Sequence, residues 1–118
     1  MFGQGRLDDA LALLSDDVSW ELYGPRTIPY FGSYRGRDGV KRFFDKLFQV
    51  EEILEFVPEE FISGEYEVVV IGREQCRAKS SGKEFSAHWA QVFSVRDGKV
   101  CRFREFIDNH SMVIAYSS

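Results

Sequence analysis

FSAHWAQVFSVRDGKVCRFREFID, residues 85–108, is the stretch that decides the fold of this chain. Two runs rich in Phe, Val, Trp and Ile flank the tetrapeptide RDGK at residues 96–99. An Asp-Gly pair between apolar runs is typical of a tight β-hairpin turn. The stretch therefore predicts a long antiparallel hairpin.

The two strands of this hairpin each have two distinct faces, because side chains alternate along a strand. The inner face is expected to carry Trp89, Gln91, Phe93 and Val95 on the first strand and Phe103, Glu105 and Ile107 on the second. The outer face is expected to carry His88, Ala90, Val92, Ser94, Arg102, Arg104 and Phe106. A Gln and a Glu among large apolar side chains fit a pocket wall, and they equally fit a half-solvated strand.

The composition of the chain predicts one domain, residues 1–118, with a substantial core. Hydrophobic residues make up 44% and aromatic residues 15%, with eleven Phe, which leaves aromatic surface for a cavity or an interface. The net charge is -4 and the Lys and Arg residues are scattered singly, so we expect no nucleic-acid partner. Cys76 and Cys101 have no second Cys or His at ligand spacing, so we expect no metal. The absence of a signal-peptide pattern and of a long apolar run predicts a cytoplasmic protein without a membrane partner.

Upstream of the hairpin, the pattern predicts a helix, a strand and a second helix. The first helix has about three turns, since Leu7 to Leu14 place apolar side chains at i, i+3, i+4 and i+7. Residues 18–23 alternate as a strand, and residues 26–36 form an aromatic loop. Asp38 is the expected N-cap of the second helix. Its apolar stripe predicts packing against a sheet, with Phe44 or Phe48 also able to reach a cavity; the stripe is Val40, Phe43, Phe44, Leu47 and Phe48.

Two more strands are predicted between this helix and the hairpin. Residues 53–62 contain Pro58, which indicates an edge position or a bend. Residues 67–77 are apolar on both faces and predict a central strand, with Gly72 at a bulge or bend. Asp108 is expected to cap a short C-terminal helix. The order predicts an α+β fold in which a strongly bent, mostly antiparallel sheet wraps around helices and encloses a space.

Four stretches in this order resemble a known family: DDVSW at 16–20, PYFGSYRGRDGV at 29–40, WAQVFSVRDGKV at 89–100 and REFID at 104–108. They are similar to the SnoaL-like branch of the nuclear transport factor 2-like and ketosteroid isomerase-like superfamily, and the resemblance covers essentially the whole chain. It implies a cone-shaped barrel of a mixed, mostly antiparallel sheet, open at one end to an apolar pocket. It also implies a homodimer paired across the outer sheet face. Family members usually begin with a longer helix than residues 1–5 provide, so we expect either a truncation or a more open pocket.

The resemblance also implies where a site would lie. An acid on the last long strand serves as catalytic acid/base in SnoaL-type cyclases, and Glu105 occupies the similar position, with Glu in place of Asp. The preceding strand often presents a His to the pocket, and here that position is Gln91. The expected pocket wall consists of Trp20, Tyr30, Phe44, Trp89 and Phe103.

Glu105 has two interpretations that the sequence leaves open. As a general base among apolar neighbours it would have a raised pKa, and Gln91 could hydrogen-bond the substrate oxygen. As a structural residue it would form an ion pair with Arg102, Arg104 or Arg73.

Three functions are compatible with these residues. The first is a metal-free, cofactor-independent isomerase, cyclase or hydrolase acting on a small, apolar carbonyl compound. The second is a module that binds a hydrophobic ligand without converting it. The third is a dimerisation domain that uses the outer face of the hairpin.

Overall fold

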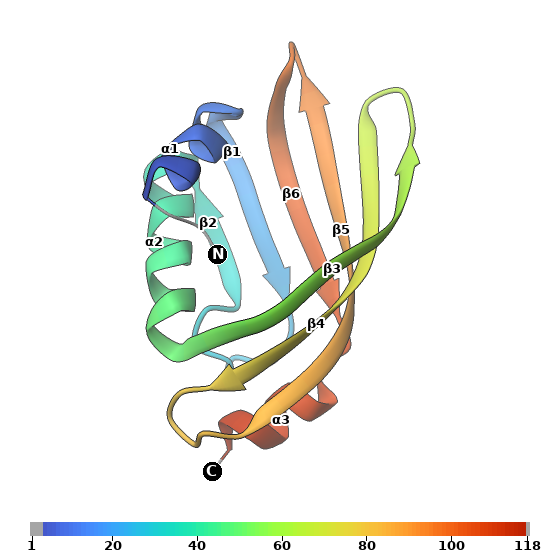
Figure 1. Ribbon diagram of the computed structural model, residues 1–118. Helices are drawn as coiled ribbons and strands as arrows, with labels where there is room; N and C mark the ends of the chain where they lie inside the picture. The colour runs from blue at the N-terminus through green and yellow to red at the C-terminus, as the bar shows by residue number, and fades with distance from the viewer. Residues whose placement is uncertain (1–3, 118) are drawn as a thin grey trace.

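The computed structural model describes residues 4–117, which form three helices and one six-stranded sheet (Figure 1). The elements in chain order are α1 (Gln4–Ala12), β1 (Leu14–Tyr23), β2 (Gly32–Arg35), α2 (Gly36–Val50), β3 (Glu51–Ser63), β4 (Glu67–Ala78), β5 (Glu84–Arg96), β6 (Lys99–Ile107) and α3 (His110–Tyr116). The strand order is β2-β1-β6-β5-β4-β3. None of these helices is long and apolar enough to cross a membrane.

The sheet is mixed, because β1 runs parallel to β6 and the other neighbouring strands are antiparallel. It is strongly bent and stays open between its edge strands β2 and β3. In Figure 1, α2 stands on one side of the enclosed space, β3 and β4 sweep around the other side, and α3 lies across the lower end. We call the enclosed space the cone. The predicted α+β class, with a bent and mostly antiparallel sheet wrapped around helices, is confirmed.

The predicted hairpin is β5 and β6, which pair from Trp89 and Ile107 to Arg96 and Lys99. Its turn places Asp97 at φ 53° and Gly98 at φ 75°. Two successive residues with positive φ are characteristic of a type I′ turn, which Asp-Gly forms with little strain. This local geometry explains why the turn was visible in the sequence.

The two predicted interruptions of the sheet lie opposite each other, since Pro58 on β3 pairs with Gly72 on β4. The pairing shifts next to Pro58, and β3 is an edge strand, as the Pro predicted. At Gly72 a Cβ would lie 2.5 Å from a ring carbon of Trp89 and too close to the backbone oxygen of Val57. The missing side chain therefore lets the indole lie flat against β4.

The predicted first helix is wrong at both ends. It begins at Gln4, before Leu7, and ends at Ala12, before Leu14. Leu14 starts β1 instead of completing the apolar stripe, because its partner Val100 on β6 draws this segment into the sheet. A backbone hydrogen bond of 2.9 Å from Val100 N to Leu13 O supports this pairing. Of the short N-terminal segment 1–5, residues 1–3 lie outside the described part.

Three further local predictions need correction. Part of the expected aromatic loop forms β2, which pairs with β1. The N-cap of α2 is Arg35 and makes no side-chain cap bond, while Asp38 lies in the first turn. The N-cap of α3 is Asn109, and Asp108 instead donates its backbone N–H to His88 O at 2.9 Å. In each case pairing with a neighbouring strand sets where the element begins.

The apolar stripe of α2 packs against the sheet, as predicted. Val40, Phe43 and Leu47 are buried and belong to the same core cluster as Trp20 on β1. Phe44 is only half-buried at the edge of that cluster. The core therefore lies between α2 and the β1 side of the sheet, which leaves the β3 side of the cone less filled.

Candidate functional site

The inner wall of the cone follows from the register of β4, β5 and β6. Gln91 pairs with Val70 on β4 and with Glu105 on β6, and Phe93 pairs with Phe103. These residues share a face with buried Trp89, which confirms the predicted sorting into two faces from Trp89 to Ser94; the pairing with β6 shifts between Ser94 and Val95.

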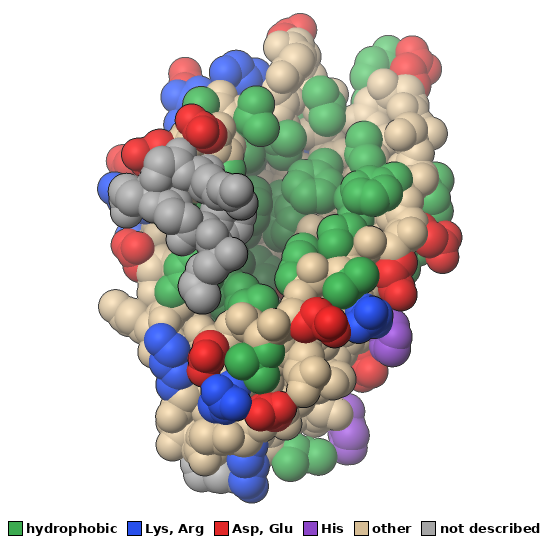
Figure 2. Space-filling view, in the orientation of Figure 1, with side chains coloured by type: hydrophobic (Ala, Val, Ile, Leu, Met, Phe, Trp, Pro, Cys, Tyr) green, Lys and Arg blue, Asp and Glu red, His purple; other side chains and the backbone are tan. Residues whose placement is uncertain are grey.

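The cone is open toward β3. Phe56 and Phe61 are 45% and 68% exposed, although each pairs with an inward-facing residue of β4, Glu74 and Val70 respectively. Figure 2 shows a hollow lined by hydrophobic side chains between the β3–β4 arm and the helical side of the molecule. Inward-facing aromatic rings that stay exposed indicate space for an apolar ligand.

Glu105 is one of three buried carboxyl groups among the described residues, with 8% of its surface exposed. The side-chain amide of Gln91 donates a 2.7 Å hydrogen bond to its Oε1. Burial is the main reason that the pKa of Glu105 rises to about 7; the hydrogen bond from Gln91 lowers it, and the charge of Glu51 raises it. The carboxyl group can therefore exchange a proton near neutral pH.

The ion-pair interpretation of Glu105 is wrong. Arg102 binds Glu21 at 3.1 Å and Arg104 binds Glu67 at 3.1 Å, both on the outer face. Arg73 binds Glu55 at 2.7 Å, also outside. Because successive side chains of a strand point to opposite faces, these guanidinium groups lie on the outer face, away from Glu105.

The structure brings three of the five expected wall residues together. Trp20 stacks on Phe103 with ring centroids 3.9 Å apart, and Phe44 lies 6.0 Å from Trp20. Trp89 lies farther along the wall, stacked on Phe56 at 4.7 Å. Tyr30 is fully enclosed in the core.

Tyr30 leads to a polar cluster that the sequence analysis missed. Its hydroxyl donates a 2.9 Å hydrogen bond to Oε1 of Glu51, and Tyr116 on α3 donates a 2.7 Å bond to the same oxygen. Glu51 is 3% exposed. Burial raises its pKa, while the two tyrosine hydroxyls act in the opposite direction.

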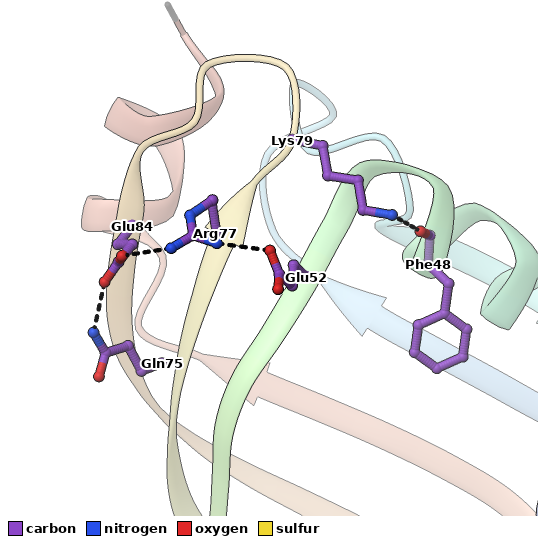
Figure 3. Close-up of polar contacts among 6 residues, drawn as sticks. All are labelled: Phe48, Glu52, Gln75, Arg77, Lys79 and Glu84. Carbon is purple, nitrogen blue, oxygen red and sulfur yellow. Dashed lines mark hydrogen bonds and ion pairs between the residues drawn. The ribbon is translucent and has the colours of Figure 1, made fainter. Parts of the chain in front are cut away.

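The junction between α2 and β3 fixes the direction of Glu51, and Figure 3 shows the contacts made by residues near it, among them Phe48 and Glu52. Lys79 donates from Nζ to the backbone oxygen of Phe48 at 2.6 Å and from its backbone N to Val50 O at 2.8 Å. Outside the sheet, Arg77 bridges Glu52 at 2.7 Å and Glu84 at 2.8 Å. Because Glu52 is held outward, the adjacent Glu51 points inward.

Glu74 on β4 is the third buried acid, with 9% of its surface exposed. The thiol of Cys76 lies 3.4 Å from its Oε2. Burial raises the pKa of Glu74 to about 8, with further contributions from the charges of Glu105 and Glu51. The period-two pattern of β4, in which Glu74 shares a face with Val70 and Cys76, is the signal that could have revealed it.

Glu51, Glu74 and Cys76 are also the described residues closest to a metal-binding arrangement, with ligand atoms within 4.8 Å of one another. Burial raises the pKa of the Cys76 thiol strongly, and the neighbouring carboxyl groups add to that shift. In this cluster Glu51 already accepts hydrogen bonds from two tyrosine hydroxyls, so the described residues form a carboxyl and phenol network.

The fold and this acidic, aromatic-lined cone agree with a match to a family model. Residues 1–103 match the SnoaL-like domain. The chain belongs to the SnoaL-like family. No protein with a curated description matches it.

Solved structures show the same architecture. An NTF2-like protein from Burkholderia xenovorans is 30% identical with a TM-score of 0.87, and the match covers 98% of this chain and 86% of that one. A candidate isomerase from Rhodopseudomonas palustris is 19% identical with a TM-score of 0.77, covering 96% and 94%. A candidate SnoaL-like polyketide cyclase from Jannaschia is 19% identical with a TM-score of 0.80, covering 98% and 81%. This SnoaL-like chain therefore has the fold of small-molecule isomerases and cyclases.

Proposed function

We propose that this SnoaL-like protein is a cofactor-independent isomerase or cyclase that acts on a small, largely apolar carbonyl compound, with Glu105 as the acid/base. The observation that carries the proposal is the environment of Glu105. It is buried on the inner wall, it is hydrogen-bonded to Gln91, and it forms no ion pair among residues 4–117. The isomerase and cyclase descriptions of structural neighbours support the same reaction class.

In the proposed reaction, Glu105 transfers a proton at a carbon next to a carbonyl group. A base works best when its pKa is close to the working pH, and burial raises the pKa of Glu105 to about 7. Glu105 removes the proton, the electron pair moves toward the carbonyl oxygen, and the protonated Glu105 returns the proton at another position. The apolar wall around Trp20 and Phe103 excludes water from this exchange.

Gln91 serves this reaction chiefly by positioning Glu105. One N–H of its amide is directed to Oε1 of Glu105, so a second N–H is left to donate to a substrate oxygen. This second N–H would donate to the substrate oxygen, on which negative charge develops as the proton leaves. The role is weaker than that of a His, because an amide cannot carry the proton itself.

The test is exchange of protons α to the carbonyl in deuterated buffer, followed by NMR for a panel of apolar cyclic ketones. We expect the wild-type protein to accelerate exchange and Glu105→Gln to abolish the acceleration. Glu65→Gln, which removes an exposed carboxyl group in the β3–β4 turn, serves as the matched control and should exchange at the wild-type rate. Ketones that bind without any accelerated exchange would favour the ligand-binding alternative.

We also propose that two copies pair through the outer face of β4, β5 and β6. Val69 pairs with Val92, and Ile71 pairs with Ala90, so an apolar strip runs across this face. It continues to Phe106, which is 47% exposed. Sedimentation at micromolar concentration should show a dimer that Val92→Glu converts to a monomer; a wild-type monomer would exclude this interface.

A further inference from the structure

The charge inside the cone is of one sign. Every buried charged side chain among the described residues is a Glu, namely Glu51, Glu74 and Glu105, and none is a Lys or Arg. The three carboxyl groups come from β3, β4 and β6, three different parts of the chain. A buried charge normally has a partner of opposite sign. Here the residues whose burial is described do not supply one.

The three acids differ in the number and strength of the hydrogen bonds that they accept. Glu51 accepts from two tyrosine hydroxyls, and Glu105 accepts from the Gln91 amide. Within residues 4–117, Glu74 has only the weak thiol contact with Cys76, although it too is buried. Glu74 is therefore the acid whose hydrogen-bonding capacity is least used.

An independent polar group on the same wall also lacks a partner. Among residues 4–117 the indole Nε1–H of Trp89 has no acceptor, which is also true of the Trp20 indole, and the Trp89 side chain is 2% exposed. This indole faces the cone and lies against Gly72, the inward-facing neighbour of Glu74 on β4. An unpaired buried donor beside a buried acid with few hydrogen bonds indicates that a ligand supplies the missing hydrogen-bond partners of both groups.

We propose that the cone takes apolar compounds that carry a protonated amine, with the nitrogen at Glu74, so that Glu105 stays free for proton transfer, and an oxygen acceptor directed to the Trp89 indole N–H. The amine supplies the buried cation that the described residues lack, and its N–H groups can donate to the oxygens of the Glu74 carboxyl group. The aromatic rings of Trp89 and Phe56 give the rest of the cation a favourable surface. Anionic ligands are excluded by the same three acids.

This inference names the substrate class of the proposed function, and it rests on that function only in placing the ligand in the cone. Ligand binding and proton exchange are separate measurements. If amines bind preferentially but no proton exchange is accelerated, the amine site is supported and the proposed enzyme activity is contradicted. If neutral ketones exchange faster but amines bind no better, the enzyme activity is supported and the amine site is contradicted.

The experiment compares three probes of one shape and different charge by calorimetry at pH 7.5: 1-naphthylmethylamine, 1-naphthalenemethanol and 1-naphthoate. We expect the amine to bind about tenfold or more tightly than the alcohol, and the carboxylate to bind most weakly. Glu74→Gln should remove most of the preference for the amine, with Glu105→Gln as a second variant if the first does not fold. Glu65→Gln should keep the full preference.

Proton linkage gives a second readout. The groups that face Glu74 are Glu105, Glu51, Cys76, Tyr30 and Tyr116. Since a bound cation favours ionised carboxyl groups, amine binding should release protons, measured as a heat that depends on the ionisation enthalpy of the buffer. Equal or weaker binding of the amine, binding of none of the probes, or an equal loss of preference in Glu65→Gln would overturn the proposal.

Discussion

The side-chain amide of Gln91 on β5 and the carboxyl group of Glu105 on β6 face each other across one register position and share a 2.7 Å hydrogen bond. This bond stabilises the ionised form of Glu105 and so lowers its pKa against the effect of burial. Replacement of Gln91 by Leu should therefore raise the pKa of Glu105 above about 7. It should also cost about 1 kcal/mol of unfolding free energy. Carboxyl carbon shifts followed by NMR during a pH titration report this pKa.

Gln75→Leu is the matched control for this prediction, because Gln75 donates a 2.9 Å bond to Glu84 on the exposed outer face. It removes the same kind of bond in solvent and should leave the pKa of Glu105 unchanged. An unchanged Glu105 titration in Gln91→Leu would show that the bond does not stabilise the carboxylate.

The stability of the protein should fall as the pH rises from about 5 to about 8. Burial raises the pKa of Glu74 from its ordinary value of 4.5 to about 8. Between these values the folded state holds a proton that the unfolded state has released, so the stabilisation is complete below the unfolded pKa and is lost as pH passes the folded pKa. One such proton gives a slope of about 1.4 kcal/mol per pH unit. Urea unfolding at a series of pH values measures it.

Glu74→Gln removes one titrating group and should reduce this slope, because Glu105, with a pKa of about 7, still contributes to it. Relative to the wild type, the variant should gain stability between pH 5 and pH 8. Glu65→Gln should retain the wild-type slope, because its carboxyl group is exposed. A wild-type stability that rises across the same interval would contradict the raised pKa.

Tyr116 ties α3 to the cone through its 2.7 Å bond to Glu51. Tyr116→Phe leaves Glu51 with Tyr30 as its remaining hydroxyl donor, and we expect a loss of about 1–2 kcal/mol in unfolding free energy. Chemical denaturation measures the loss. Tyr66→Phe is the control, since Tyr66 is 67% exposed and its change should stay within about 0.5 kcal/mol.

Gly72 is needed for close packing. In Gly72→Ala the new methyl group meets the Trp89 ring at 2.5 Å, so the indole or β3 must move, at a cost of about 1–3 kcal/mol. Tryptophan fluorescence should shift to longer wavelength as the indole becomes more hydrated. In Gly64→Ala the nearest atom is 3.5 Å away, so this control should keep the wild-type spectrum and stability. Equal stability of the two variants would contradict the close contact at Gly72.

The elements that the sequence predicted correctly depend on short-range signals. The Asp97-Gly98 turn and the alternation around Gln91 and Glu105 each involve a few consecutive residues, and both appear in the structure as expected. The helix boundaries were predicted wrongly because they depend on contacts with residues far away in the sequence. Leu14 fits a helical stripe locally, but pairing with Val100, far along the chain, places it in β1.

Two buried acids of the site were missed because their surroundings are assembled from distant segments. Glu51 follows a helix directly and gave no sign of burial, and its donors Tyr30 and Tyr116 are 21 and 65 residues away. Glu74 was detectable by its period-two position among apolar residues. That position shows the face, but it does not show what else shares the enclosed space.

The sequence by itself thus determined the hairpin, the two faces of its strands and the family, since turn chemistry and side-chain alternation are local properties of the backbone. Only the tertiary structure decided that Glu51, Glu74 and Glu105 lie in one cone without a buried cation among the described residues. The bend of the sheet brings β3, β4 and β6 around a common space, and burial there raises the pKa of each carboxyl group. The concentration of acids inside the cone therefore results from three separate strands that only the fold brings together.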